Sequence, residues 1–252
     1  MIEDILKDYD IIKLKEMDSV KLMNRKECKY TVSYEKLISI LSKLSEEYFI
    51  LDIHGEKLMP YESIYYDMPD FNLYTSHQNG KQNRYKVRCR TYALTGDSFL
   101  ELKFKNNKKR TIKKRIKVDH NYDLFDNKTF LEENLPFSPK RLEKKIEIKY
   151  KRITLVDKSL KERVTIDLNL SYLSKDKETS YDALSIIEIK YQGERRDSKI
   201  DTLLREERIK PLSFSKYCLG ISQHYTTVKQ NSMNIKIREI NKNIGEEVLI
   251  RA

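Results

Sequence analysis

Apolar and polar side chains alternate with a period of two over most of residues 26–193, which is the pattern of β-strands with two different faces. Short turns at 95–97 and 106–109 join neighbouring segments into hairpins. The expected strands are residues 26–32, 62–68, 83–94, 98–105, 110–118, 144–156, 161–172 and 184–193. Eight strands at this spacing predict one antiparallel sheet that closes or nearly closes on itself.

A helical period is clearest at residues 34–49, where the apolar side chains form one stripe behind Ser33, a good N-cap. This segment predicts an amphipathic helix that covers the sheet. Further helices are expected at 201–209 and 122–135, with a shorter one inside 69–80. From Thr226 onward the pattern is weaker, so a helix, a strand and a loose tail all stay open.

The chain length and charge narrow the class of protein. No Pro/Gly-rich linker divides the 252 residues, so we expect one domain over 1–225 and a C-terminal extension at 226–252. Lys and Arg number 50 against 39 Asp and Glu, which gives a net charge of +11. This balance favours an anionic partner, such as nucleic acid, an acidic membrane surface or a phosphate-rich small molecule. A solvated lysine-rich surface is the alternative that charge alone leaves open.

One expected strand carries a row of four cations, spaced roughly 7 Å apart by the strand rise. The stretch NRYKVRCRTY at 83–92 places on one face Arg84, Lys86, Arg88 and Arg90. Such a row is either a wet outer face or the wall of a barrel that encloses an anion. If the polar faces point inward, the apolar faces of the strands point outward and need helices to cover them. The helices expected at 34–49 and 201–209 can do so. We therefore predict a mainly β fold with covering helices (α+β), a closed antiparallel eight-stranded tunnel barrel with a polar interior.

Three carboxylates stand among the cations on the predicted polar faces, and they are Glu27, Glu101 and Glu188. Each either forms an ion pair with a neighbouring Lys or holds a divalent metal that bridges phosphate oxygens. Carboxylate ligands with few His residues favour Mg²⁺ or Mn²⁺ over zinc. Both roles stay open for each carboxylate.

Other chemistries lack their residue patterns. No G-x-x-x-x-G-K-[ST] loop occurs, so a P-loop enzyme is excluded, and no Ser, His and Asp arrangement indicates nucleophilic catalysis. The cysteines Cys28, Cys89 and Cys218 lie far apart, which argues against a disulfide framework and a zinc site. An acidic start and the lack of a long apolar run predict a soluble, cytoplasmic protein.

The order of short motifs along the chain adds a family resemblance. In sequence they are RKECKY, SIYYD, YKVRCR, LELK, IKKR, ERVTIDLN, IIEIKY and FSKY. This order resembles the VTC domain, the polyphosphate polymerase module of the vacuolar transporter chaperone family, over roughly residues 18 to 225. That family belongs to the triphosphate tunnel metalloenzymes. The resemblance implies a tunnel in which the terminal phosphate of ATP passes to inorganic polyphosphate, with Mn²⁺ or Mg²⁺ as cofactor.

The resemblance also implies roles for single residues. Matching motifs give phosphate ligands with catalytic roles at Lys29, Arg88, Arg90, Lys103, Lys113, Arg163 and Lys216. Glu188 matches the metal ligand, and Glu27 and Glu101 are expected as further carboxylates for the metal. Neighbouring positions extend the expected substrate-binding set to Arg25, Arg84, Lys86, Arg115 and Lys190.

One departure from the superfamily pattern bears on the reaction. Phosphatase and cyclase members begin with E-x-E-x-K, whereas this chain has Arg25-x-Glu27-x-Lys29. Losing the first carboxylate weakens metal binding there and favours polymer synthesis. Eukaryotic family members also carry a phosphate-sensing domain and membrane spans, which this sequence lacks, so a membrane-protein partner for polymer export stays open.

Three alternatives to a polymerase stay open. They are a tunnel triphosphatase or tripolyphosphatase with water as the acceptor, a non-catalytic polyphosphate-binding protein, and a nucleic-acid-binding β-barrel. No nucleic acid partner is expected, because the strand period turns Tyr85 and Phe104 away from the cations. The oligomeric state is unknown from the sequence.

Overall fold

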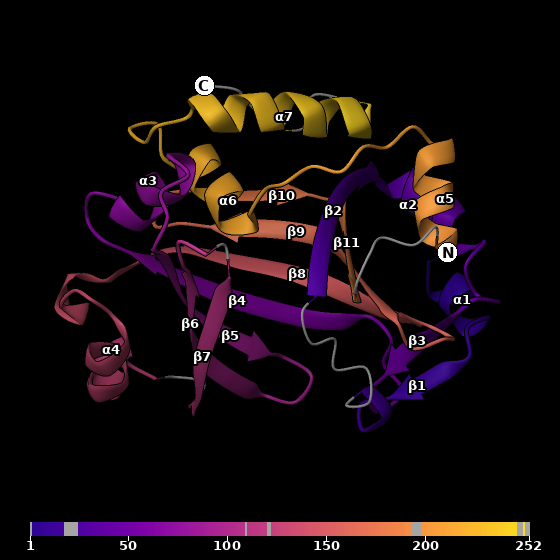
Figure 1. Cartoon of the computed structure of the whole chain (residues 1–252), viewed down its shortest axis with the longest axis horizontal. Helices are drawn as coiled ribbons and strands as arrows, with labels where there is room; N and C mark the ends of the chain where they lie inside the picture. Colours follow the sequence, from indigo (N-terminus) through magenta and orange to yellow (C-terminus); the bar gives the residue numbers. More distant parts are fainter. Residues whose placement is uncertain are drawn as a thin grey trace.

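One strongly curved sheet with helices on both faces makes up most of the protein (Figure 1). The computed structural model describes residues 2–17, 25–108, 110–119, 122–192, 198–245 and 249, and the side chains of Arg25 and Gln192 lie outside the described part. Along its main path the strands pair in the order β2 (Arg25–Ser33), β11 (Leu184–Gln192), β9 (Glu162–Leu173), β8 (Glu143–Asp157), β4 (Met59–Asp67), β5 (Arg84–Tyr92), β6 (Asp97–Lys105) and β7 (Thr111–Val118). Three short strands join this path at its sides, β1 (Ile11–Lys13), β3 (Tyr48–Asp52) and β10 (Glu178–Tyr181).

The helices lie before, between and after the strands. They are α1 (Ile2–Lys7), α2 (Tyr34–Leu41), α3 (Asn72–Gln78), α4 (Lys128–Asn134), α5 (Lys199–Glu206), α6 (Lys216–His224) and α7 (Asn231–Ile244), with the 3₁₀ turns η2 (Leu124–Asn127) and η3 (Pro139–Arg141). None of the described helices is both long and apolar enough to span a bilayer.

The eight predicted strands are all present, and the mainly antiparallel α+β class is confirmed. The predicted closed barrel is wrong, because among the described residues β2 pairs with β11 alone and β7 with β6 alone. The sheet therefore has two open edges, and it has 11 strands instead of eight. Lys113, Arg115 and Lys117 are exposed on β7, and a charged edge strand resists pairing with another basic strand.

The sequence missed β1, β3 and β10 because each is too short for a period of two to stand out. The predicted helix at 34–49 is also longer than the helix that forms. That helix ends at Leu41, and Tyr48–Asp52 instead forms β3, which pairs with β8. Hydrogen bonding to the sheet thus overrides a helical pattern that is only local.

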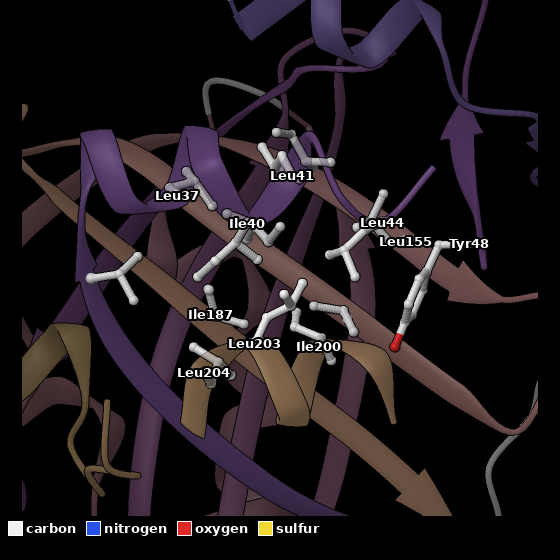
Figure 2. Packing of buried hydrophobic residues seen from close by; sticks show 14 of the residues in the cluster. Leu37, Ile40, Leu41, Leu44, Tyr48, Leu155, Ile187, Ile200, Leu203 and Leu204 are labelled. Atoms are coloured by element: carbon white, nitrogen blue, oxygen red, sulfur yellow. The ribbon is translucent and has the colours of Figure 1, made fainter. Parts of the chain in front are cut away.

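The apolar side chains of the strands form the outer face of the sheet, which helices cover. Figure 2 shows α2 and α5 meeting over the strands, with Leu37 and Ile40 from one helix and Leu203 and Leu204 from the other packed near Ile187. Farther along the same face, η2 and α4 cover β5 and β6. Because the outer face carries most of the apolar strand positions, the charged positions of the same strands are left on the other side, the inner face.

At one end the inner face is itself apolar and covered by α6 and α7. In β9 the alternation of side chains between the two faces is broken at Asn169, whose φ of 52° is left-handed. As a result Leu170 joins this second core, while Leu168, two residues earlier, belongs to the outer one. Gly220 lets α6 approach the strands closely, because a Cβ there would lie 2.4 Å from the Tyr172 ring. The helix thus fills one end of the curved sheet.

The buried carboxylate of Asp67 joins α3 and α6 to the end of β4. It accepts hydrogen bonds from the backbone N–H groups of Leu73 at 2.9 Å and Tyr74 at 2.8 Å. It also accepts one from the hydroxyl of Tyr217 on α6. One side chain therefore binds two N–H groups at the N-terminus of α3, which have no partner within the helix, and fixes the place of α6.

Replacing Asp67 with Asn is expected to lower the free energy of unfolding by about 2–4 kcal/mol, because the amide accepts fewer hydrogen bonds and its NH₂ group faces other donors. Urea denaturation of the variant measures the loss. Asp70→Asn, an exposed change three residues away, is the matched control and should leave the midpoint within error. Equal midpoints for the two variants would show that Asp67 does not hold the helices.

Candidate active site

Cationic side chains from most strands of the sheet share its inner face. We call this set the cationic face, and its members are Lys29, Lys86, Arg88, Arg90, Lys103, Lys113, Arg152, Arg163, Lys190 and Lys216. The strand register sets Lys86, Lys103 and Lys113 directly opposite one another across β5, β6 and β7. Like charges in direct cross-strand pairs repel, so this row is stable only if something else offsets it.

The inner face is concave. Its curvature is evident because charges from distant strands lie close enough to act on one another. Burial is the main cause that lowers the pKa of Lys29 on β2, and the charges of Lys216 on α6 and Lys103 on β6 lower it further. β2 and β6 stand almost at opposite ends of the strand order. The sheet therefore curves far enough to bring cations from both ends within electrostatic reach, as in a tunnel with one open side.

Arg88 lies near the centre of this face and is held from two sides. Its guanidinium donates to Glu101 at 2.7 Å and to the Tyr65 hydroxyl at 3.0 Å. Glu101 also forms an ion pair with Lys113 at 2.5 Å. Burial alone would raise the pKa of Glu101, but Arg88 and Lys113 outweigh it and lower that pKa to about 2. The carboxylate is thus ionised and fixes the orientation of Arg88.

A second carboxylate, Asp167, is clamped by two cations. Arg152 donates to it at 2.5 Å and 2.8 Å in the two-pronged geometry that suits guanidinium, and Lys216 binds the same carboxylate. These cations outweigh burial and lower the pKa of Asp167 to about 2. Lys216 begins α6, so the helix that fills one end of the sheet also delivers a cation to its middle.

The third group joins β2 and β11. Glu188 lies directly opposite Lys29 and forms an ion pair with it at 3.2 Å, and Lys190 binds its other oxygen. Lys29 also binds Glu27. Burial opposes ionisation of Glu188, yet Lys190 and Lys29 hold its pKa well below the usual range. These lysines and carboxylates form one chain of ion pairs.

One buried and one part-buried cation have no ion pair with a carboxylate in the described part of the chain. Arg90 is 9% exposed and donates to the Ser63 hydroxyl at 3.2 Å, while Lys86 donates to the Ser215 hydroxyl at 2.7 Å. The Arg90 guanidinium also lies over the ring of Tyr61, 5.4 Å from its centre. Neutral partners do not cancel charge, so Lys86 and Arg90 mark where an anion is most needed.

The structure brings most of the predicted residues to one face. Arg163 is opposite Lys190 in the register, and Arg115 is opposite Glu101 but exposed. Arg84 continues the row of β5 beyond Lys86. The side chain of Arg25 falls outside the described residues.

The sequence missed Arg152 and the acid that binds it, Asp167. The signal was present, because Arg152 follows Ile148 and Tyr150 in the apolar phase of β8, where a lone cation is out of place. Tyr150 lies under this cluster, with Arg152 5.3 Å and Lys216 5.0 Å from its ring centre. An aromatic floor thus supports cations that come from different elements.

The carboxylates do not gather into a ready-made metal site. Among the described residues no three His, Cys, Asp or Glu side chains come close enough to hold an ion together. Glu101 is engaged by Arg88 and Lys113, while Glu188 and Glu27 share Lys29. One or two carboxylates nevertheless suit Mg²⁺ or Mn²⁺ when phosphate oxygens and water supply the remaining ligands. Glu188 and Glu27 fit that description.

The family comparison covers most of the chain. The family model described as VTC domain matches residues 24–225. No curated protein matches the chain.

Solved structures show the likeness of fold. A putative adenylyl cyclase from Hippeastrum, described as having a dominant triphosphatase activity, is 14% identical with a TM-score of 0.52, over 79% of this chain and 96% of that one. A conserved hypothetical protein from Pyrococcus furiosus is 12% identical with a TM-score of 0.42, over 76% of this chain and 98% of that one. The first of these shows a common fold at low identity.

Affinity for an anion should fall as the pH rises through the pKa of Lys86. That pKa is lowered to about 8, chiefly by burial and further by the charges of Lys103 and Lys29. Lys86 is therefore cationic below about pH 8 and loses its charge above it, although a bound anion raises the pKa again. Calorimetric titration with tripolyphosphate from about pH 6.5 to about pH 9.5 measures the effect.

Lys86→Arg is the matched variant, because guanidinium stays charged over this range. It should bind more tightly than the wild type at the alkaline end and flatten the profile. Some fall should remain, since burial lowers the pKa of Lys190 to about 8 as well. Identical profiles for variant and wild type would exclude Lys86 from the binding site.

Proposed function

The chain belongs to the VTC domain family, and from this membership and the cationic face we propose that it transfers the terminal phosphoryl group of ATP to a growing inorganic polyphosphate chain. The observation that carries the proposal is the surplus of positive charge at the part-buried Lys86 and the buried Arg90, on either side of a fixed Arg88. A ligand with negative charge along its length offsets such a row better than a single phosphate does.

The proposed reaction needs positioning and charge neutralisation more than covalent chemistry by the protein. The bond from the terminal phosphorus of ATP to its bridging oxygen breaks as an oxygen at the end of the polyphosphate chain bonds to the same phosphorus, and ADP leaves. Arg88 and Arg90 suit two-pronged binding of phosphate oxygens. Lys29, Lys103 and Lys113 would act as point charges around the transferred group.

Preorganisation supports this role for Arg88. Glu101 and Tyr65 already hold its guanidinium, so little side-chain freedom is lost when a phosphate binds. Asp167 does the same for Arg152 and Lys216. The acids of the inner face would thus orient cations that then bind substrate, which is why they need not contact substrate themselves.

A divalent metal would be held by Glu188, with Glu27 as the nearest further carboxylate. When bound, it would supply positive charge that neutralises charge on the phosphate groups. Glu188 is ionised and 13% exposed, and Lys29 and Lys190 bind its two oxygens. A metal would have to displace these lysines or share the carboxylate with them. Mn²⁺ or Mg²⁺ as the cofactor, and ATP as the donor, are parts of the proposal.

A triphosphatase is the second candidate, with water in place of the polyphosphate end. It is favoured by the common fold with the Hippeastrum protein, which is described as a triphosphatase. A nucleic-acid-binding barrel has less support, because Tyr85 and Phe104 stack on each other at 4.6 Å on the outer face, apart from the cations. A non-catalytic polyphosphate-binding protein would show binding without turnover, and an export partner in a membrane stays a prediction.

Purified protein incubated with ATP and Mn²⁺ should form polyphosphate that is visible on a stained gel. Arg88→Ala with Arg90→Ala should abolish the product, since two cations that face the triphosphate are lost. Arg110→Ala, an exposed change at the hairpin between β6 and β7, should leave it unchanged. Release of orthophosphate without any polymer would instead make the protein a triphosphatase.

Glu188→Gln keeps the shape of the side chain and removes its charge. If Glu188 holds the metal, the variant should still bind ATP while metal-dependent turnover falls by at least about a hundredfold. If Glu188 only balances Lys29 and Lys190, turnover should stay near that of the wild type. A Mn²⁺ titration of both proteins, with the exposed change Glu178→Gln as control, separates the two roles.

A further inference from the structure

The row of cations on β5 continues beyond Arg88, toward α3. Lys86 comes next and is opposite Lys103, and Arg84 follows opposite Lys105. By the strand rise, Arg84 lies roughly 14 Å from Arg88 along the strand. Arg84 is part-exposed and its guanidinium donates to the backbone carbonyl of Lys81 at 2.7 Å. The row therefore leads from the buried centre of the cationic face to the protein surface.

Helix α7 adds a cation at the same end. It runs from α3 to β2, since Ser232 near its start is hydrogen-bonded to Gln78 and Asn243 near its end donates to Thr31 at 3.0 Å. Figure 1 shows it lying across α6. This helix lies outside the segment that matches the family, which ends at residue 225. What α7 contributes therefore lies beyond what the family model describes.

Lys236 is the cation in question, and it is part-buried on α7. Its charge, together with those of Lys86 and Arg84, acts on His77 of α3, and these charges add to burial, the main cause, in lowering the pKa of His77 to about 2. Lys236 and Lys86 also both act on Cys218 of α6. Hydrogen bonds bring the same elements together, since Ser232 of α7 is bonded to Gln78 of α3, and Lys86 of β5 donates to Ser215, which precedes α6.

The acid Asp67 also acts on Cys218, but its hydrogen bonds are with Tyr217 and backbone N–H groups and not with the cations at this place. In the described part of the chain Arg84, Lys86 and Lys236 form no ion pair with a carboxylate, and the hydrogen bonds of the first two go to neutral oxygens. His77 is neutral and adds no charge of its own. Three cations from two elements converge here without the acid that offsets Arg88 deeper in the face.

We propose that Arg84, Lys86 and Lys236 form an outer anion subsite, which holds the part of an inorganic polyphosphate chain that extends past Arg88 toward the surface. The subsite rests on the proposed function, because it presumes a polyphosphate chain on the cationic face. A chain with a charge on every unit fits a row of evenly spaced cations. Lys86 is shared with the deeper site, where it also binds shorter anions. An orthophosphate at Arg88 is too short to reach Arg84, so Arg84 and Lys236 contribute to the binding of long chains alone.

The test compares Lys236→Glu with Arg238→Glu. Both changes lie on α7 and alter the net charge equally, but Arg238 is exposed, while Lys236 is part-buried and lies one turn after Ser232, which is hydrogen-bonded to Gln78. Lys236→Glu should weaken binding of long-chain polyphosphate about five- to tenfold, and Arg238→Glu less than about twofold. Neither should alter affinity for tripolyphosphate by more than about twofold, because that ligand stays on the deeper cations.

Two further measurements make the outcome decisive. Lys236→Gln, which removes the charge without reversing it, should show a smaller loss of long-chain affinity in the same direction. Melting temperatures of all variants establish that α7 remains folded. Equal long-chain affinities for Lys236→Glu and Arg238→Glu would overturn the subsite, as would a loss that is larger for single-stranded RNA than for polyphosphate.

The result also separates this inference from the proposed function. If the wild type binds neither tripolyphosphate nor long chains, the proposed function itself fails. If the wild type binds both and Lys236→Glu binds long chains equally well, the outer subsite alone fails.

Discussion

Crowded positive charge on a concave, part-buried face is the constraint on which the rest of the structure depends. Lysines stand opposite lysines across β5, β6 and β7, and the row runs from the exposed Lys103 and Lys113 to the part-buried Lys86, where solvent screens charge less. The few acids are accordingly placed where they serve several cations at once, as Glu101 and Asp167 do. At Arg90 and Lys86 the hydrogen-bond partners are neutral, so a bound anion would offset charge that these partners leave in place.

Helix α6 connects this charged face to the apolar scaffold. Its first two residues have different roles. Lys216 binds Asp167 on the inner face, and Tyr217 binds Asp67 at the end of β4. Gly220 then sets how near the helix lies to the Tyr172 ring. The position of one cation in the candidate site is therefore determined by packing and by a buried carboxylate that no substrate contacts.

Much of this could be predicted from the sequence, because a period of two reports directly which side chains share a face. The rows at Arg88, Lys103 and Glu188 followed from it. Closure could not be predicted, since periodicity within strands says nothing of whether the first and last strands meet. The position of Lys236 could not be predicted for a related reason: it depends on where α7 packs, and the pattern after Thr226 is too weak to place that helix.

The two open edges give this sheet a freedom that a closed barrel lacks. Among the described residues no backbone ladder ties β2 to β7, and each strand contributes a lysine to the cationic face, Lys29 and Lys113. An anion that reached Lys29 and Lys113 together would act as the missing rung, and its departure would let the edges part. Anion binding and the separation of the two sheet edges would then be thermodynamically linked. Amide hydrogen exchange along β7 would therefore report the fraction of the protein that has an anion bound.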